Sequence, residues 1–191
     1  MKANRLEAFT DGVLAIVITI MVLDIKVPSG GSLRDLQASV PVLLAYVLSY
    51  VNVGIYWNNH HHMLHASDRI DGRAMWANLF LLFWLTLVPF VIRWTGTAGF
   101  TALPVAAYGF VLAMAAVGYT GLQWALVACN GPQSALAKSV GKDRKGKLSL
   151  ALYVVAILLA FVEPRASILL YVLVAAVWFV PDSRIEKRAG A

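Results

Sequence analysis

The sequence predicts an all-α, polytopic membrane protein, and three observations support this prediction. Of the 191 residues, 60% are hydrophobic and only 14% are charged, whereas soluble domains are about 45–50% apolar and about 25% charged. Charge-free runs long enough to cross a bilayer recur along the whole chain. Lysine and arginine are also distributed unequally between successive loops, as expected when the loops lie on opposite sides of a membrane.

We expect one domain, residues 1–191, with six transmembrane helices. Their approximate ranges are 6–27, 36–59, 74–92, 104–129, 148–162 and 166–180. The fourth helix lies in a longer uncharged stretch whose ends, GTAGFT and NGPQ, are typical of loops. The last two helices are short, and Glu163-Pro164-Arg165 forms a tight turn between them. Lys147 can extend the fifth helix by reaching toward the membrane surface.

The distribution of basic residues predicts the orientation of the chain. With the N-terminus inside, twelve lysines and arginines fall on the cytoplasmic side and four on the outer side. Such an excess on the cytoplasmic side is the usual arrangement. We therefore expect both termini in the cytoplasm, in a multi-pass protein of the cell's inner (plasma) membrane. The net charge of +6 then needs no nucleic-acid partner.

The first apolar segment, RLEAFTDGVLAIVITIMVLDIKVP, is unusual in its charges. Only twelve uncharged residues separate Asp11 from Asp24, whereas a helix needs about 20 residues to cross the hydrocarbon core. If this segment spans the membrane, at least one of these carboxylates lies near or inside the hydrocarbon depth. Ionisable groups there normally face protein or a water-filled cavity.

The same segment carries four side chains at the spacing of one helical face: Ile16, Thr19, Ile20 and Leu23. Gly12 shares this face, whereas Thr10 and Asp11 point away from it. The face fits a narrow aliphatic constriction with one hydroxyl layer, able to close by dewetting. It also fits an ordinary packing or lipid-facing stripe, and periodicity alone favours this second interpretation.

The residues at the start of the segment also have two interpretations. Arg5, Phe9, Thr10 and Asp11 can cap and anchor a helix end. Alternatively, they form a buried network from Asp11 to polar groups on other helices, which the short uncharged run supports.

All four histidines lie in NNHHHMLH, residues 58–65. His61 and His65 are four residues apart and could share a metal ion. The string also resembles one box of the di-iron desaturases, but no histidines remain for the further boxes that such enzymes need. We therefore prefer hydrogen bonds from His60, His61 and His62 to carboxylates and amides, with Asp11 as a candidate partner, and expect no metal.

The third segment, NLFLLFWLTLVPF, contributes Asn78 as a candidate for hydrogen bonds between helices. Pro89 in the same segment permits a kink, because it removes one backbone donor.

These residues resemble the lysosomal-type potassium channels, the transmembrane protein 175 family, and their prokaryotic homologues. Arg5-x-x-x-Phe9-Thr10-Asp11 is similar to the family's Arg-x-x-x-Phe-Ser-Asp, with a threonine that retains the hydroxyl. IYWNNHHHMLH and NLFLLFWLTLVPF are similar to the patterns of the family's second and third helices. The resemblance covers about residues 4–92.

The resemblance implies a potassium-permeable channel, a homotetramer with four first helices around a central pore. Rings of aliphatic side chains would close it and make it selective. By position, the implied pore residues are Ile16, Thr19 and Leu23, with Ile20 as a further layer. The residues of the implied structural network are Arg5, Phe9, Thr10, Asp11, His60, His61, His62 and Asn78. The implied partners are lipid, K⁺ and further copies of the chain, with no cofactor and no enzymatic activity.

Three other functions remain open on the residues alone. A proton- or cation-coupled secondary transporter would use Asp11 and the cluster from His60 to His62. A metal-dependent membrane enzyme or metal carrier would use the histidine block. A structural membrane subunit would have no activity of its own.

Overall fold

A computed structural model describes residues 3–23, 25, 27–28, 30–37, 39–140 and 143–179, and the regular elements in these ranges are all helices. They are α1 (Ala3–Leu23), α2 (Leu33–Gln37), α3 (Val40–His65), α4 (Gly72–Thr86), α5 (Val88–Thr97), α6 (Ala102–Asn130), α7 (Ala135–Val140), α8 (Arg144–Leu159) and α9 (Pro164–Phe179). Asp24 lies outside the described residues.

Four helical segments in this part of the chain are long and apolar enough to cross a membrane. They are α1, α3, α6 and the pair α4–α5 taken together over Gly72–Thr97. The 21 residues of α1 give a length of about 30 Å at 1.5 Å per residue, which matches a hydrocarbon core. α9 is apolar but shorter. The protein is therefore an all-helical, multi-pass membrane protein, as the composition predicts.

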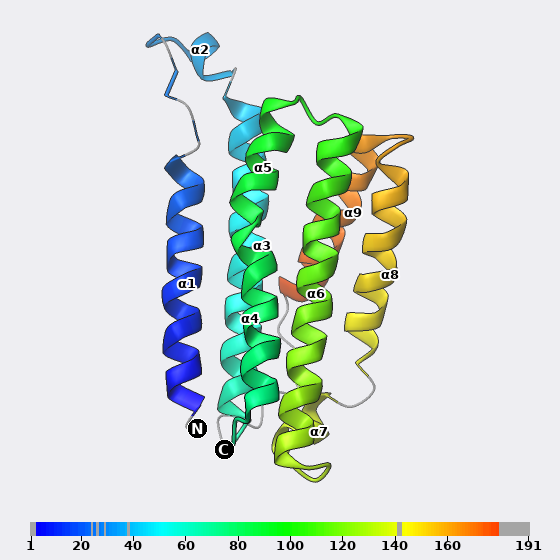
Figure 1. Ribbon diagram of the computed structural model, residues 1–191. Coiled ribbons are helices and arrows are strands. Elements are labelled where there is room, and N and C mark those ends of the chain that lie inside the picture. Colours follow the sequence, from blue (N-terminus) through cyan, green and yellow to red (C-terminus); the bar gives the residue numbers. More distant parts are fainter. Residues whose placement is uncertain are drawn as a thin grey trace.

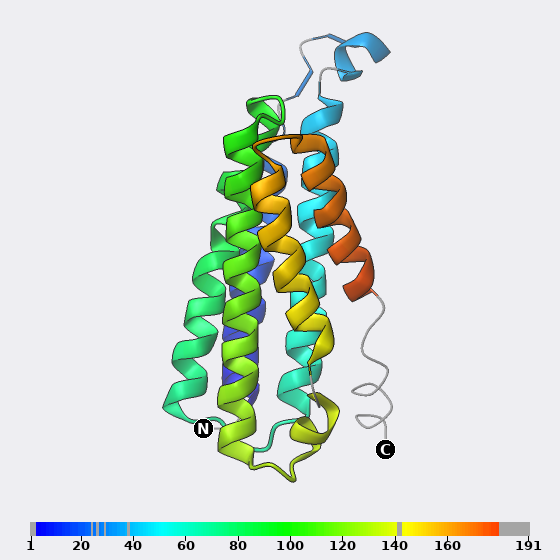
Figure 2. The same cartoon turned by 90° about the vertical axis from the view of Figure 1, so that its right-hand side faces the viewer.

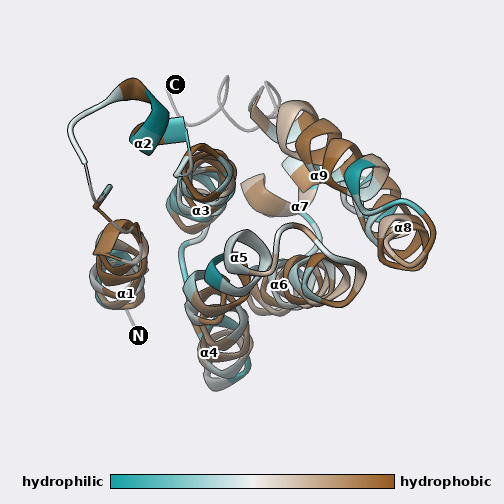
Figure 3. Ribbon diagram, turned by 90° about the horizontal axis from the view of Figure 1, so that it is seen from above, coloured by the Kyte–Doolittle hydropathy of each residue, from teal (hydrophilic) through white to brown (hydrophobic). Residues whose placement is uncertain are grey.

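The long helices run side by side, and α1 stands at one edge of the bundle (Figures 1 and 2). Viewed along the helices, α1 faces α3 and α4, whereas α8 and α9 lie on the far side (Figure 3). α1 contacts α3, α4 and α5, while α6 contacts α4, α5, α8 and α9. α6 is thus the central helix of the subunit, and α1 is a peripheral one.

The packing around α6 is close and includes buried polar contacts. A Cβ atom at Gly118 would lie 2.9 Å from the Cα of Leu81, so glycine allows α6 to approach the backbone of α4. The Ser49 hydroxyl donates to the Tyr108 hydroxyl at 3.1 Å, and the Tyr171 hydroxyl donates to the Val105 carbonyl at 3.2 Å. These hydrogen bonds join α6 to α3 and to α9.

The predicted third span, 74–92, corresponds to two helices with a break at Leu87. Pro89 has no backbone N–H and cannot continue the hydrogen-bond ladder. The Leu87 N–H instead donates to the Trp84 carbonyl at 3.2 Å, and the Thr86 hydroxyl donates to the Phe83 carbonyl at 2.7 Å. α5 then continues to Thr97, beyond the expected end.

Other helix ends also differ from the expected ones. α3 continues to His65, beyond the expected end at residue 59, so it includes all four histidines. α1 ends at Leu23, before the expected residue 27. Between α1 and α3 lies the short α2, where the Ser32 hydroxyl donates to the Asp35 carboxylate at 2.5 Å. This bond, with a second from the Ser32 N–H, lowers the pKa of Asp35.

Candidate functional site

α1 has one face that packs against its own subunit. The buried residues of this face recur at intervals of three and four: Leu6, Thr10, Leu14, Val17 and Met21. They face the contacts with α3, α4 and α5. Because four of the five are apolar, α1 is attached to the bundle mainly by the close packing of this face.

The opposite face of α1 carries the four residues of the predicted stripe, and all four are exposed in the subunit. Ile16 is 59% exposed, Ile20 46% and Leu23 81%, and Thr19 is also exposed. Gly12 lies on the same side, and apart from its chain neighbours and the nearby backbone of α1, no described atom lies within 4 Å of the position of an added Cβ. The subunit therefore leaves this face of α1 uncovered.

The stripe borders a shallow groove toward α5. Its lining residues are Val13, Ile16, Val17, Ile20, Thr86, Pro89, Phe90 and Arg93. Within the stripe, the Thr19 hydroxyl lies 2.9 Å from the Ala15 carbonyl and 3.0 Å from the Ile16 carbonyl. Its single proton is thus donated to the helix backbone, which leaves the lone pairs of the oxygen as acceptors. An exposed oxygen in this state can contact a cation.

A chain of buried hydrogen bonds joins α1 to α4 and α3. The Asn78 amide donates to the Thr10 hydroxyl at 2.9 Å, and its carbonyl oxygen lies 2.8 Å from Nε2 of His60. None of the three side chains is more than 1% exposed. Because an amide oxygen only accepts, Nε2 of His60 carries the proton in this contact. Nδ1 of His60 is then an acceptor with no partner among the described residues.

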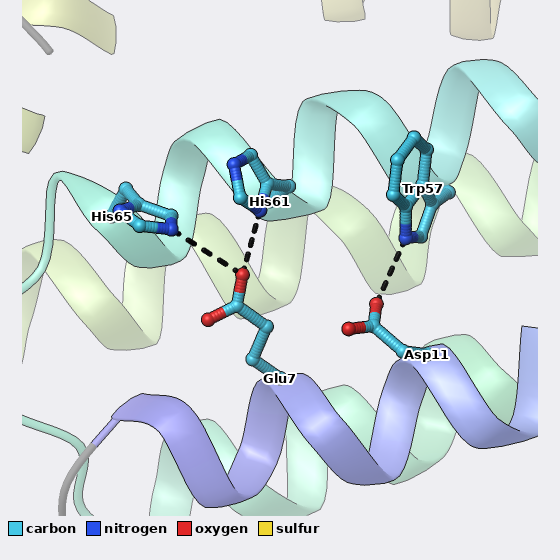
Figure 4. A network of polar contacts seen from close by, with 5 residues as sticks. All are labelled: Glu7, Asp11, Trp57, His61 and His65. Carbon is cyan, nitrogen blue, oxygen red and sulfur yellow. Dashed lines mark hydrogen bonds and ion pairs between the residues drawn. The ribbon is translucent and has the colours of Figure 1, made fainter.

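A second set of polar contacts joins α1 to α3 alone (Figure 4). The indole N–H of Trp57 donates to the Asp11 carboxylate at 2.9 Å. One turn earlier on α1, the Glu7 carboxylate lies 2.6 Å from Nδ1 of His61 and 3.5 Å from Nε2 of His65. Among the described residues, the hydrogen-bond partner of Asp11 is therefore a tryptophan, where the sequence suggested a histidine.

The structure thus places the residues of the predicted network in different surroundings. Thr10, Asn78 and His60 share the buried chain, and Asp11 and His61 belong to the second set. His62 packs its ring edge-on against His61 at 5.6 Å. Two further members point outward: Arg5 is exposed and Phe9 is 52% exposed.

Two residues of the site were not singled out from the sequence, namely Glu7 and Trp57. A signal for both was present in the spacing. Glu7 and Asp11 are four residues apart on α1, and Trp57, His61 and His65 repeat the same interval on α3. Residues four apart lie on one helical face, so two antiparallel helices with this spacing can pair their polar side chains in register.

The chain resembles known channels in sequence and in fold. A family profile described as "Endosomal/lysosomal potassium channel TMEM175" matches residues 5–89. A potassium channel of Chryseobacterium is 48% identical over 187 residues, which cover 98% of this chain and 97% of that protein. The human endosomal/lysosomal proton channel TMEM175 is 36% identical over 96 residues, which cover 44% of this chain and 19% of that protein.

The fold agrees with these sequence relationships. The crystal structure of a lysosomal potassium-selective channel TMEM175 homologue from Chamaesiphon minutus superposes with a TM-score of 0.83, at 25% sequence identity. The match covers 94% of this chain and 97% of that chain. All these relatives are named as channels, and the Chryseobacterium protein is related over almost its full length. The chain therefore belongs to the TMEM175 family of ion channels and is not an enzyme.

Proposed function

We propose that this chain forms a potassium channel, in which K⁺ moves down its gradient through a central pore lined by α1. The observation that carries the proposal is the stripe of Ile16, Thr19, Ile20 and Leu23. It is exposed on a membrane-length helix whose opposite face is fixed to the subunit. A relative that matches over almost the full length is named as a potassium channel, which supports K⁺ as the permeant ion.

The stripe has the chemistry of a narrow, closable constriction. Ile16, Ile20 and Leu23 would form apolar rings, from which water withdraws when the pore is narrow. K⁺ sheds its hydration shell at lower cost than Na⁺, so such a constriction favours K⁺. A ring of Thr19 oxygens would replace part of the lost hydration, since the hydroxyl protons are already donated to the backbone.

A single α1 cannot enclose a pore, so the proposal requires several copies of the chain. We infer a homotetramer, in which closed rotational symmetry brings the same face of α1 to one axis from each subunit. The exposed apolar face of α1 supports this assembly, because the subunit alone leaves it uncovered. Native mass spectrometry should then show four times the chain mass of 20.8 kDa.

We further propose six membrane crossings with both termini in the cytoplasm of the inner membrane. α8 and α9 have 16 residues each, somewhat fewer than the usual 20 or so, and Lys147 can extend α8 to the membrane surface. The basic residues of the described ranges support the orientation (Figure 1). At the end of the bundle where α1 begins they are Arg5, Arg69, Arg73, Lys138, Arg144, Lys145 and Lys147, and at the other end they are Arg34, Arg93 and Arg165.

The main rival is a proton- or cation-coupled transporter that uses Asp11 and the histidines His60 to His62. Two contacts argue against a continuous proton relay. The hydrogen-bond partner of Asp11 among the described residues is Trp57, and the Asn78 amide, which joins Thr10 to His60, has no acidic proton to pass on. A transporter would show saturable flux coupled to a second gradient. The human relative is named as a proton channel, so proton currents should be measured beside K⁺ currents.

The proposal is tested by K⁺ flux into proteoliposomes of the purified chain. A channel gives rapid flux that depends only on the K⁺ gradient and voltage, and Leu23→Ala changes its rate. Flux that requires a proton or Na⁺ gradient would reject the channel in favour of the transporter. Liposomes that stay silent under all gradients would favour a structural subunit.

A further inference from the structure

Three side chains near the first turns of α1 converge on one point, away from the stripe (Figure 4). One oxygen of Glu7 lies 2.6 Å from Nδ1 of His61 and 3.5 Å from Nε2 of His65. The three ligand atoms all lie within 4.8 Å of one another. The sequence offered only the two histidines of α3, and the structure adds a carboxylate from a different helix.

We propose that Glu7, His61 and His65 form a binding site for a divalent transition-metal ion, with Zn²⁺ as the reference ion. Imidazole nitrogens and a carboxylate oxygen are suitable ligands for this class of ion. Two histidines one helical turn apart can present their nitrogens to the same ion. With Glu7 they supply three protein ligands, which leaves one tetrahedral position for water.

The distances are close to those that a bound ion requires. Two ligands at about 2.0–2.1 Å from a tetrahedral Zn²⁺ lie about 3.3 Å apart. The separation of Glu7 and His65, 3.5 Å, already fits this value. The contact of Glu7 with His61, at 2.6 Å, is a hydrogen bond and would lengthen by about 0.7 Å to admit the ion.

The surroundings of the three residues suit a metal site that is open to water. The side chains of His61 and His65 are 40% and 55% exposed, and that of Glu7 is 17% exposed. An ion can therefore enter from water and keep one water ligand. Trp57 stacks on the His61 ring with 27° between the planes, and Asp11 holds Trp57. These contacts orient His61, as supporting residues commonly do around metal ligands.

A bound ion would connect α1 to α3 more firmly than the hydrogen bond that it replaces. Because the ligands come from two helices, only the assembled fold presents all three. Binding therefore stabilises the folded subunit and holds the first turns of α1 in place. This site does not depend on the proposed pore, because none of its residues belongs to the stripe.

The test is isothermal titration calorimetry, in which Zn²⁺ is titrated into purified, chelator-treated protein in detergent. The preparation must lack a polyhistidine tag. We expect one ion per chain for the unaltered protein, and an affinity at least about tenfold lower for Glu7→Gln and for His65→Gln. His62→Gln is the matched control, since His62 touches His61 but offers no ligand to the site. It should bind Zn²⁺ as the unaltered protein does.

Thermal unfolding gives a second readout. Zn²⁺ should raise the unfolding temperature of the unaltered protein and of His62→Gln, but not that of His65→Gln. Since His65 is exposed, His65→Gln should unfold at the unaltered temperature without metal, which shows that the variant folds. The proposal would be overturned if the unaltered protein did not bind one Zn²⁺ per chain. It would also be overturned if His62→Gln and His65→Gln lost Zn²⁺ affinity equally. Neither measurement records ion currents, so neither result supports or contradicts the channel proposal.

Discussion

The subunit buries one long face of α1 and leaves the other exposed. One face, from Leu6 to Met21, is buried against α3, α4 and α5 and includes Thr10 in a chain of buried hydrogen bonds. The other, from Gly12 to Leu23, has no cover and carries mostly branched aliphatic side chains. In a soluble protein an uncovered apolar face marks a contact with something else. In a membrane-length helix the candidates are lipid, another subunit and a pore.

The largest effect on stability should come from the buried face. Asn78→Ala removes the group that bonds both Thr10 and His60, and each would be left buried without its partner. We expect a loss of about 1–3 kcal/mol in the free energy of unfolding, the usual cost of an unsatisfied buried group. Unfolding in detergent, followed by circular dichroism, measures it.

A suitable control for this variant is Asn58→Ala. Asn58 is half-buried on the same helix as His60, and no hydrogen bond of its side chain is found within the described residues. Equal unfolding temperatures for the two variants would mean that the buried chain does not hold α1 in place.

The largest effect on conduction should come from the exposed face. Ile16→Asn and Leu23→Ala each remove a large apolar side chain from the proposed rings, so conductance should rise several-fold or ion selectivity should relax. Their unfolding free energies should change by no more than about 0.5 kcal/mol, as for other exposed positions. Unaltered currents and selectivity in both variants would mean that Ile16 and Leu23 do not line the pore.

A smaller effect is expected at the hydroxyl layer. Thr19→Val keeps the shape of the side chain but removes the oxygen, so the preference for K⁺ over Na⁺ should fall while current remains. Thr19→Ser keeps the hydroxyl and should keep the preference. Reversal potentials in mixed K⁺ and Na⁺ solutions compare the two variants. Equal selectivity in both would mean that the Thr19 hydroxyl does not contact the permeant ion.

The smallest effect is expected for Asp11→Asn. An asparagine oxygen can still accept the hydrogen bond of Trp57, so folding and K⁺ flux should persist. A coupled transporter that depends on the Asp11 carboxylate would instead lose all flux. Flux measurements on this variant therefore separate the channel from its main rival.

Composition and charge were sufficient to predict the helical membrane class, because long uncharged runs leave few alternatives in a bilayer. The spacing of Ile16, Thr19, Ile20 and Leu23 placed them on one face, and all four are exposed. Periodicity could not show which face the subunit covers, since both faces of α1 are apolar. That information lies in the contacts with α3, α4 and α5.

The polar contacts were harder to predict than the helices. Asn78 was identified as a group that bonds between helices, and it contacts both α1 and α3. Glu7 and Trp57 were not identified, because their roles depend on the register of α1 against α3 rather than on either sequence alone. The break before Pro89 was expected as a kink, and its position at Leu87 follows from the missing backbone donor.

The most direct test of the central claim is single-channel recording of the purified chain in a planar bilayer, first in K⁺ and then in Na⁺. The account predicts discrete current steps that are larger in K⁺, and step sizes that change in Ile16→Asn. They should not change in Leu169→Asn, a control at a residue of α9 that is 70% exposed. Discrete K⁺ steps that are the same in both variants would contradict a pore lined by α1.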